Sequence, residues 1–294
     1  MNFDEVGLEQ IKRSCEVSIL LVVATDIELE VMRSGLKPFE EGEFVQKTYL
    51  SELTVYIGLY GEYCTALVKT NTMGATQRGA SYDTTSAAIG EFMPKVVIMP
   101  GIAFGRDSQK QHIGDILVSK TLLPYESQRI NHDGTKHYRG ETPSANMTLY
   151  NRFTQNKTHR YQYENTLKEA NIVGGGILTG EKLVDNIQYK NELIGEFPTA
   201  VGGEMEGLGV YAACDSKQIP WIVVKSICDW GDGSKLKIHQ HRCCSAVKSF
   251  INASLKSKRL FESLGVQPFW DQVPDVPEIR IDAGDPPRDM WTRS

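Results

Sequence analysis

The sequence GGEMEGLGVYAACDSKQIPWIVVKSICDWGD occupies residues 202–232 and contains the clearest structural pattern in the chain. Glu204 and Glu206 precede a helical segment, and an apolar run at 221–227 follows that segment and leads to Asp229. Such a run is typical of a strand buried on both faces of a parallel sheet. Ligands of open α/β sheets bind at the carboxyl ends of the strands, so acids placed there predict a functional site.

The composition is that of a globular protein and disfavours several classes of function. The chain has 294 residues, of which 40% are hydrophobic and 23% charged, with a formal net charge of −5. An acidic chain lacks the basic footprint of a nucleic-acid-binding protein, and no apolar run reaches the roughly 20 residues of a membrane span. The N-terminal residues lack the apolar core of a signal peptide. We therefore expect a cytoplasmic protein with reduced cysteines and with no nucleic-acid or membrane partner.

Apolar runs and helical patterns alternate along most of the chain, which predicts an α/β fold. Strands are expected at 17–24, 53–59, 63–68, 95–100, 116–119, 172–179, 200–203 and 221–227, and helices at 25–32, 74–89, 184–196, 206–216 and 242–264. This alternation predicts a largely parallel sheet covered by helices. The expected hairpin at 53–68 adds antiparallel pairing, so we expect a mixed central sheet flanked by helices.

The same pattern suggests how the chain is divided. Residues 1–16 are polar and are expected to form an N-terminal arm, and residues 17–265 one domain. Within that domain, residues 123–164 lose the periodicity and form a polar insertion that is long for a simple connection. The Pro-rich tail at 266–294 is expected to extend over the surface or over a neighbouring subunit, or to be disordered.

Each acid also has an ordinary structural interpretation. Glu204 and Glu206 could complement a helix dipole, Asp229 could cap the following segment, and Glu28 could be a surface charge on a helix. If residues 204–206 are extended, however, both glutamates face the same side and Met205 the other. The functional interpretation depends on all of these acids following strand ends.

Other motifs do not match known nucleotide or metal sites. GGILTGEK at 175–182 approaches a P-loop, but Glu181 precedes Lys182 and no Ser or Thr follows. No GxGxxG follows the first strand, and no GxSxG of a hydrolase occurs. Metal-capable side chains gather near the last helix: His239, His241, Cys243 and Cys244. Zinc ligand pairs usually need a spacer between adjacent cysteines, so no metal site is expected.

Several short motifs lie after strands or at the starts of helices. They are Ala24-x-x-x-Glu28, Met73-Gly74, Pro100-Gly101-Ile102-Ala103, Ile113-Gly114-Asp115-Ile116, Thr179-Gly180-Glu181, Gly203-Glu204-Met205-Glu206-Gly207, Ser226-Ile227-Cys228-Asp229 and Asp232-Gly233. With these motifs, the chain from about Val17 to Leu264 resembles the nucleoside phosphorylase and nucleosidase superfamily, especially its methylthioadenosine/S-adenosylhomocysteine nucleosidase branch. The sequence around Glu204-Met205-Glu206 also resembles that of phosphorylase-like domains in bacterial immune proteins, some of which hydrolyse ATP.

The resemblance implies a role for each candidate residue. Breaking a purine N-ribosidic bond needs a protonated leaving base and an attacking nucleophile. Asp229 would protonate or hydrogen-bond purine N7, Glu206 would hold the ribose hydroxyls above Met205, and Glu28 would activate water. Further substrate-binding positions would be Glu204, Gly101, Met73, Leu183 and Val184, with the Val184 backbone facing the base. The family implies no metal or organic cofactor, a purine nucleoside or nucleotide as the bound partner, and a homo-oligomer.

Some features depart from the family pattern. Cys228 replaces the usual Ser before the catalytic Asp, and Leu183 replaces an aromatic residue that stacks on the base. The insertion at 123–164 is longer than in the compact nucleosidases and carries Arg129, Lys136, His137, Arg139 and Arg160. These cations could form a solvated loop or a clamp on a substrate 5′-phosphate, to which Arg78 and Lys182 would add.

We therefore expect a purine N-ribosyl hydrolase that acts on an adenine nucleotide such as ATP or AMP, and whose resemblance to immune domains suggests a role in antiviral, anti-phage defence. Hydrolysis is favoured over phosphorolysis because the Glu28 carboxylate would repel an anionic phosphate nucleophile. The alternatives are a methylthioadenosine/S-adenosylhomocysteine nucleosidase, a purine nucleoside phosphorylase, a non-catalytic nucleotide sensor, and an effector that is inactive until a partner or oligomerisation orders the insertion.

Overall fold

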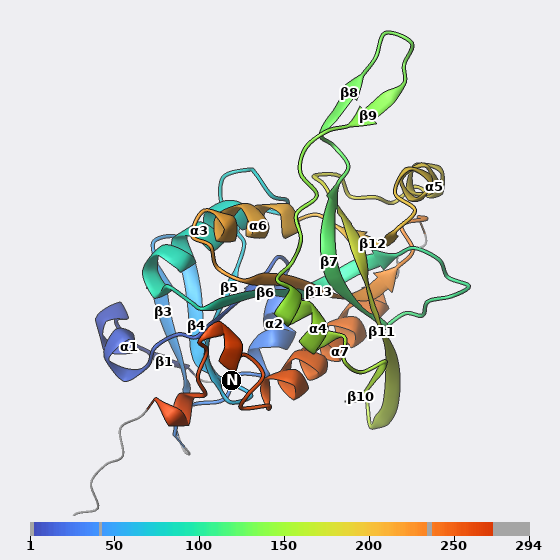
Figure 1. Ribbon diagram of the computed structural model, residues 1–294. Coiled ribbons are helices and arrows are strands. Elements are labelled where there is room, and N and C mark those ends of the chain that lie inside the picture. Colours follow the sequence, from blue (N-terminus) through green and yellow to red (C-terminus); the bar gives the residue numbers. More distant parts are fainter. Residues whose placement is uncertain (1–2, 41–42, 234–236, 273–294) are drawn as a thin grey trace, which may run out of the picture.

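A computed structural model describes residues 3–40, 43–233 and 237–272 of the chain (Figure 1). The strands are β1 (Phe3–Glu5), β2 (Ile19–Val23), β3 (Val45–Leu50), β4 (Leu53–Tyr60), β5 (Tyr63–Lys69), β6 (Val96–Gly105), β7 (Ile116–Pro124), β8 (Gln128–Ile130), β9 (Lys136–Tyr138), β10 (Thr158–Tyr163), β11 (Thr166–Thr179), β12 (Ala200–Glu204) and β13 (Trp221–Asp229). The helices are α1 (Leu8–Ser14), α2 (Asp26–Arg33), α3 (Ser81–Phe92), α4 (Met147–Phe153), α5 (Ile187–Glu196), α6 (Gly207–Asp215) and α7 (Lys237–Leu255).

One mixed sheet runs through the molecule in the order β1-β3-β4-β5-β2-β6-β12-β11-β7-β13. Its centre is parallel, because β2 pairs in parallel with β5 and β6, and β6 pairs in parallel with β13. β13 also pairs antiparallel with β7, which closes strands β6, β12, β11, β7 and β13 into a ring. The mixed sheet expected from the sequence is confirmed.

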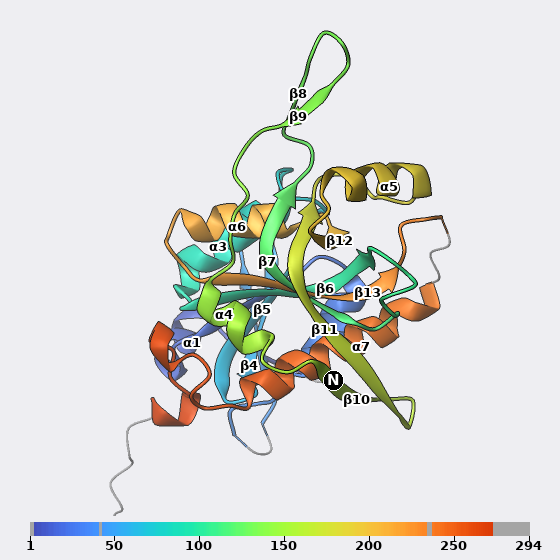
Figure 2. The same cartoon turned by 45° about the vertical axis from the view of Figure 1, so that its right-hand side comes forward.

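Helices cover both faces of the sheet. α3 packs beside α6 on one face, and α2 packs beside α7 on the other (Figures 1 and 2). The hairpin β8–β9 projects away from the body in both views. Within the described residues, no helix has the length and apolarity needed to cross a bilayer.

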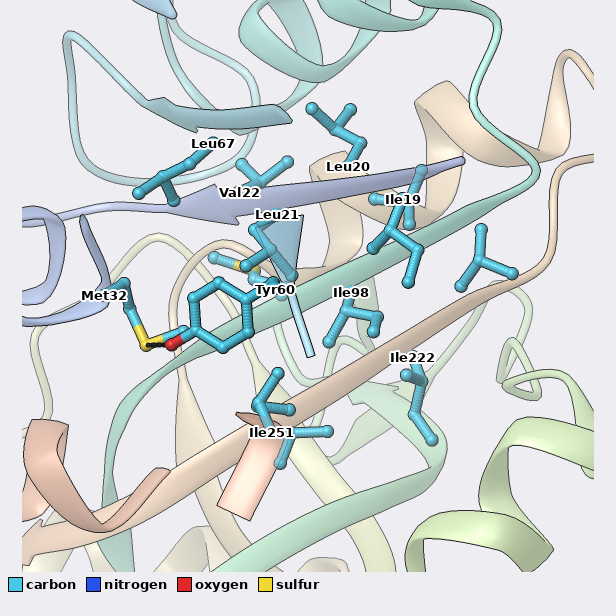
Figure 3. Packing of buried hydrophobic residues seen from close by; sticks show 14 of the residues in the cluster. Ile19, Leu20, Leu21, Val22, Met32, Tyr60, Leu67, Ile98, Ile222 and Ile251 are labelled. Carbon is cyan, nitrogen blue, oxygen red and sulfur yellow. Dashed lines mark hydrogen bonds between the residues drawn. The ribbon is translucent and has the colours of Figure 1, made fainter. Parts of the chain in front are cut away.

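The core forms around β2, where every residue is buried. Side chains of β2, β6 and β13, including Leu21, Ile98 and Ile222, pack together there (Figure 3). Burying such a side chain contributes roughly 1.5–3 kcal/mol, so the strands that carry the site residues are rigidly placed. Tyr60 is fully buried in this region, and its hydroxyl donates a hydrogen bond to the sulfur of Met32 at 3.8 Å.

Several element boundaries differ from those predicted. The helix expected at 74–89 begins only at Ser81, because Gly74 and Gly79 adopt left-handed backbone with φ of +93° and +74°. The helix expected at 242–264 spans Lys237–Leu255 instead. Its end is fixed by the β4–β5 turn, where the Glu62 N–H donates to the Leu255 carbonyl at 2.9 Å.

β1 and β3 were not predicted, because their pattern is weak. Only Val45 and Thr48 of β3 are buried, so its six residues show little apolar alternation. Pairing with β4 holds β3 in place, and β1 pairs in parallel with β3. A local hairpin therefore forms β3, whereas β1 depends on a contact with residues about 40 positions away in the sequence.

The arm, insertion and tail expected from the sequence lie as follows. The arm includes β1, and the Arg33 guanidinium lies over the Phe3 ring at 4.9 Å. The insertion contains the projecting hairpin, followed by α4 and β10, which pack on the body. Val266 and Phe269 at the start of the tail are buried in the core, and residues 273–294 lie outside the described part of the chain.

Candidate active site

A pocket at the strand ends contains the acids singled out in the sequence. It encloses about 610 Å³ of empty space, including open solvent at its mouth. Its lining includes nine of the expected residues: Glu28, Met73, Lys182, Leu183, Val184, Glu204, Met205, Glu206 and Asp229. Acids that follow β2, β12 and β13 thus face one cavity.

Glu28 is held by backbone donors. It is the third residue of α2, and it forms a capping box with Thr25, whose side chain accepts from the Glu28 N–H. Its Oε2 accepts from the N–H groups of Ala24 and Thr25, both at 2.9 Å, and its Oε1 accepts from the Ile102 N–H at 2.8 Å. Backbone amides from two segments therefore fix this buried carboxylate in the pocket wall.

Glu204 and Glu206 have different environments. Glu204 ends β12, and its Oε2 accepts from the N–H groups of Glu206 at 2.9 Å and Gly207 at 2.8 Å. Glu204 therefore shapes the turn into α6. Glu206 is the N-cap residue of α6, and its Oε1 accepts from the Gly74 N–H at 3.3 Å. Burial raises the pKa of Glu206 to about 7. Repulsion from Glu204 and Glu28 adds to this increase, whereas attraction to Lys225 reduces it.

Lys225 of β13 lies beside these acids and was not predicted as a site residue. It is fully buried, and its Nζ lies 4.0 Å from Glu204 Oε2 with no hydrogen-bond partner among the described residues. Burial alone would lower the pKa of Lys225, but attraction to Glu28, Glu204 and Glu206 raises it. Its position in the sequence could have indicated this role, because it is the only lysine in the apolar strand WIVVKSICD.

Gly101, an expected substrate-binding residue, instead makes room for this charge cluster. A Cβ atom added at Gly101 would lie 2.3 Å from Glu28 Oε1 and 2.7 Å from Lys225 Nζ. Gly101 is not part of the pocket lining. The absence of a side chain lets the carboxylate and the ammonium approach each other.

Asp229 lies at the end of β13 and is oriented by its neighbours. Its Oδ1 accepts from the Gly231 N–H at 2.9 Å, and its Oδ2 accepts from the thiol of Cys228 at 3.1 Å. The Cys228 thiol therefore helps to orient the carboxyl group of the residue that follows it. Val184 is buried nearby, and its carbonyl lies close to Gly231.

Two exposed apolar residues, Met73 and Leu183, line the pocket beside the exposed Lys182. The Met73 and Leu183 side chains are 46% and 59% exposed, although both line the pocket. Phe104 and Gln240 also line it and were not predicted, since Gln240 is one polar residue among several at the start of α7.

The cations expected to form a phosphate clamp are dispersed in a single chain. Lys182 lines the pocket and is paired with Glu126. Arg78 is outside the pocket lining, and its guanidinium lies 2.7 Å from the Glu52 carboxylate. Arg129 lies in β8 of the projecting hairpin and Arg139 follows β9, and both are exposed and outside the lining. Arg160 pairs with Glu169 at 2.8 Å.

Replacing Glu206 with Gln should make stability less sensitive to pH. Near pH 4 the carboxyl is protonated in both the folded and the unfolded chain. As pH rises from about 4.5 to about 7, the unfolded chain releases this proton first, which favours unfolding. Gln stays neutral, so the Tm of Glu206→Gln minus that of the wild type should increase between pH 5 and pH 8. Glu169→Gln at an exposed pair is the control, and an unchanging difference would contradict the burial of this charge.

Comparison with known proteins places the chain in a family and agrees with its fold. A sequence model of the Phosphorylase superfamily matches residues 18–257, so the chain belongs to that superfamily. A death domain-containing ATP nucleosidase of Amphimedon queenslandica is 26% identical over 261 residues, which cover 83% of this chain and 49% of that protein. The match therefore spans only about half of that relative's length.

Compact nucleosidases are matched over most of their length. A 5′-methylthioadenosine/S-adenosylhomocysteine nucleosidase of Staphylococcus epidermidis is 25% identical over 215 residues, covering 72% of this chain and 86% of that protein. Among solved structures, the enzyme of the same name from S. pneumoniae matches with a TM-score of 0.65 at 16% identity, covering 82% of this chain and 99% of that one. Futalosine hydrolase of Helicobacter pylori matches with a TM-score of 0.62 at 18% identity, covering 82% and 97%. These structures share the fold of this chain.

Proposed function

We propose that residues 17–265 form a catalytic domain that hydrolyses the N-ribosidic bond of a purine nucleoside or nucleotide. The observation that carries this proposal is the convergence of Glu28, Glu206 and Asp229 on one pocket from three strand ends. The nucleosidase names of the relatives support it. The three carboxyl groups match the needs of glycosidic cleavage, namely a proton donor, a group that holds the sugar, and a group that orients water.

Asp229 is proposed to act on the base. Donors from Gly231 and Cys228 orient its carboxyl group, beside the buried Val184 that lines the same cavity. Protonation or hydrogen bonding at purine N7 makes the base a better leaving group, and a positioned acid typically contributes 10²–10⁴-fold.

The two buried glutamates are proposed to act on the sugar and on water. Glu206 accepts hydrogen bonds from the ribose hydroxyls, and Met205 packs beneath the ring. Three backbone amides hold Glu28 so that it can orient a water at the anomeric carbon. Three glutamates with one buried lysine give this part of the pocket a negative balance, which disfavours an anionic phosphate nucleophile and hence phosphorolysis.

We propose an adenine nucleotide as the substrate. This finer proposal is supported by the relative named an ATP nucleosidase and by the basic residues of the insertion. Lys182 contributes a cation to the pocket lining. Release from Glu126 would free it to bind a phosphate, and Arg78, Arg129 and Arg139 would join it only after a rearrangement.

A thioether nucleoside is the second candidate. It is favoured by two exposed apolar residues of the pocket lining, Met73 and Leu183, and by the names of the compact relatives. Purified protein should be incubated with ATP, AMP, adenosine, methylthioadenosine and inosine, and the free base quantified by reverse-phase chromatography. Adenine from ATP or AMP with higher kcat/KM than from methylthioadenosine supports the nucleotide proposal, and the opposite order reverses it.

The role in the cell is proposed from resemblance. An antiviral effector would deplete adenine nucleotides only after infection, so cells expressing the protein should lose ATP and gain adenine when challenged with phage. If the protein is a non-catalytic sensor, Asp229→Asn should leave the resistance of these cells to phage unchanged. An effector silent until assembly predicts base release that increases steeply with protein concentration.

A further inference from the structure

Glu181 connects the two loops that flank the pocket. It lies two residues after β11, in a segment whose next residue, Lys182, lines the cavity. Its Oε1 accepts from the N–H of Ala75 at 3.1 Å, the N–H of Thr76 at 3.2 Å and the hydroxyl of Thr76 at 3.1 Å. A carboxylate that accepts three donors forms a strong, directional contact.

The loop that Glu181 contacts also contacts the proposed sugar-binding acid. The Gly74 N–H donates to Glu206 Oε1 at 3.3 Å, and the preceding Met73 lines the pocket. A Cβ atom added at Gly74 would lie 2.2 Å from Glu181 Oε2, so Glu181 packs directly against this glycine. The two carboxylates therefore approach Gly74 together, and only Glu206 faces the cavity.

The other side of Glu181 is anchored to the body. Its backbone N–H donates to Glu126 Oε2 at 2.8 Å, and the hydroxyl of Tyr125 donates to the Lys182 carbonyl at 3.1 Å. The Ser81 hydroxyl at the start of α3 donates to the Glu206 carbonyl at 2.6 Å. Glu181 therefore restrains the loop that contacts Glu206, because Glu181 is itself anchored at the end of β11.

We propose that Glu181 is a positioning residue that holds the Gly74 N–H on Glu206 and so aligns Glu206 with the 2′- and 3′-hydroxyls of ribose. The proposal rests on the proposed function of Glu206 as the sugar-binding acid. Glu181 acts through the loop at 73–76 and does not itself touch the substrate. Its loss should therefore weaken contacts to the sugar hydroxyls selectively and leave contacts to the base in place.

Sugar selectivity separates this role from a general loss of loop stability. Binding of adenosine and of 2′,3′-dideoxyadenosine should be measured by titration calorimetry in the Asp229→Asn background, where turnover is slow, with and without Glu181→Ala or Glu181→Gln. Glu181→Ala should weaken adenosine binding about tenfold, since a hydrogen bond to a charged group is worth at least that much. Binding of the dideoxy ligand should change less than about twofold. Gln keeps one acceptor oxygen and should restore most of the adenosine affinity.

Glu52→Ala is the matched control, because it removes the ion pair to Arg78 on the same loop without touching residues 74–76. In the same background it should leave both affinities unchanged. An equal loss for both ligands, or an identical effect of Glu52→Ala, would overturn the proposal. Because binding needs no turnover, the result stands apart from the test of catalysis, where the absence of base release by wild type counts against the proposed function alone. Thermal unfolding of each variant shows whether it is folded.

Discussion

Asp229→Asn is expected to lower kcat for base release by about a thousandfold with little change in KM. A positioned acid contributes 10²–10⁴-fold, and the amide of Asn cannot supply a proton. Asn keeps a carbonyl oxygen that can accept from the Gly231 N–H, so the turn at 229–231 should be preserved. Initial rates of base release across a range of substrate concentrations separate kcat from KM.

Cys228→Ser is the matched control for Asp229→Asn. The serine hydroxyl can donate to Asp229 Oδ2 as the thiol does, so activity should remain within a few-fold of wild type. Turnover of Asp229→Asn within tenfold of wild type, with the Tm unchanged, would contradict the assignment of Asp229 as the acid.

Lys225→Met is expected to destabilise the protein by about 3–5 kcal/mol at pH 8, because it leaves buried carboxylates without their cation. Lys225 is fully buried, and its charge is attracted to the carboxylates of Glu28, Glu204 and Glu206. Lys225 also lowers the pKa of Glu206 relative to burial alone. At pH 5 Glu206 is protonated in either protein, so the loss should be smaller. Denaturant unfolding at the two pH values measures both effects.

A second substitution tests whether charge is the cause. Glu204→Gln in the Lys225→Met background removes one of the unpaired carboxylates, and it should restore part of the stability lost at pH 8. Wild-type stability of Lys225→Met at pH 8 would show that this lysine does not neutralise the cluster.

The sequence was sufficient to predict that the acids lie at strand ends, because the apolar run of each strand shows where that strand stops. The runs at 17–24 and 221–227 predicted β2 and β13, and the residues after them, Glu28 and Asp229, face the same pocket. The significance of Lys225 could not be predicted in the same way. It depends on three side chains, from α2, from β12 and from the N-cap of α6, that approach one another only in the folded chain.

The insertion shows the same limit on a larger scale. Its polar residues gave no periodicity, yet β10 forms by pairing with β11, and α4 packs on β7 and β13. The cations at 129 and 139 were grouped with Lys182 from composition alone. Their distribution along an exposed hairpin follows from tertiary structure, which a count of charges does not contain.

The sugar product tests the central proposal of hydrolysis most directly. Wild-type protein should be incubated with its best purine substrate in phosphate buffer, and both products identified by mass spectrometry. We predict free purine base and a sugar with a hydroxyl group at C1, formed at a rate independent of phosphate. A sugar carrying phosphate at C1, or the absence of free base from every purine substrate, would contradict the account.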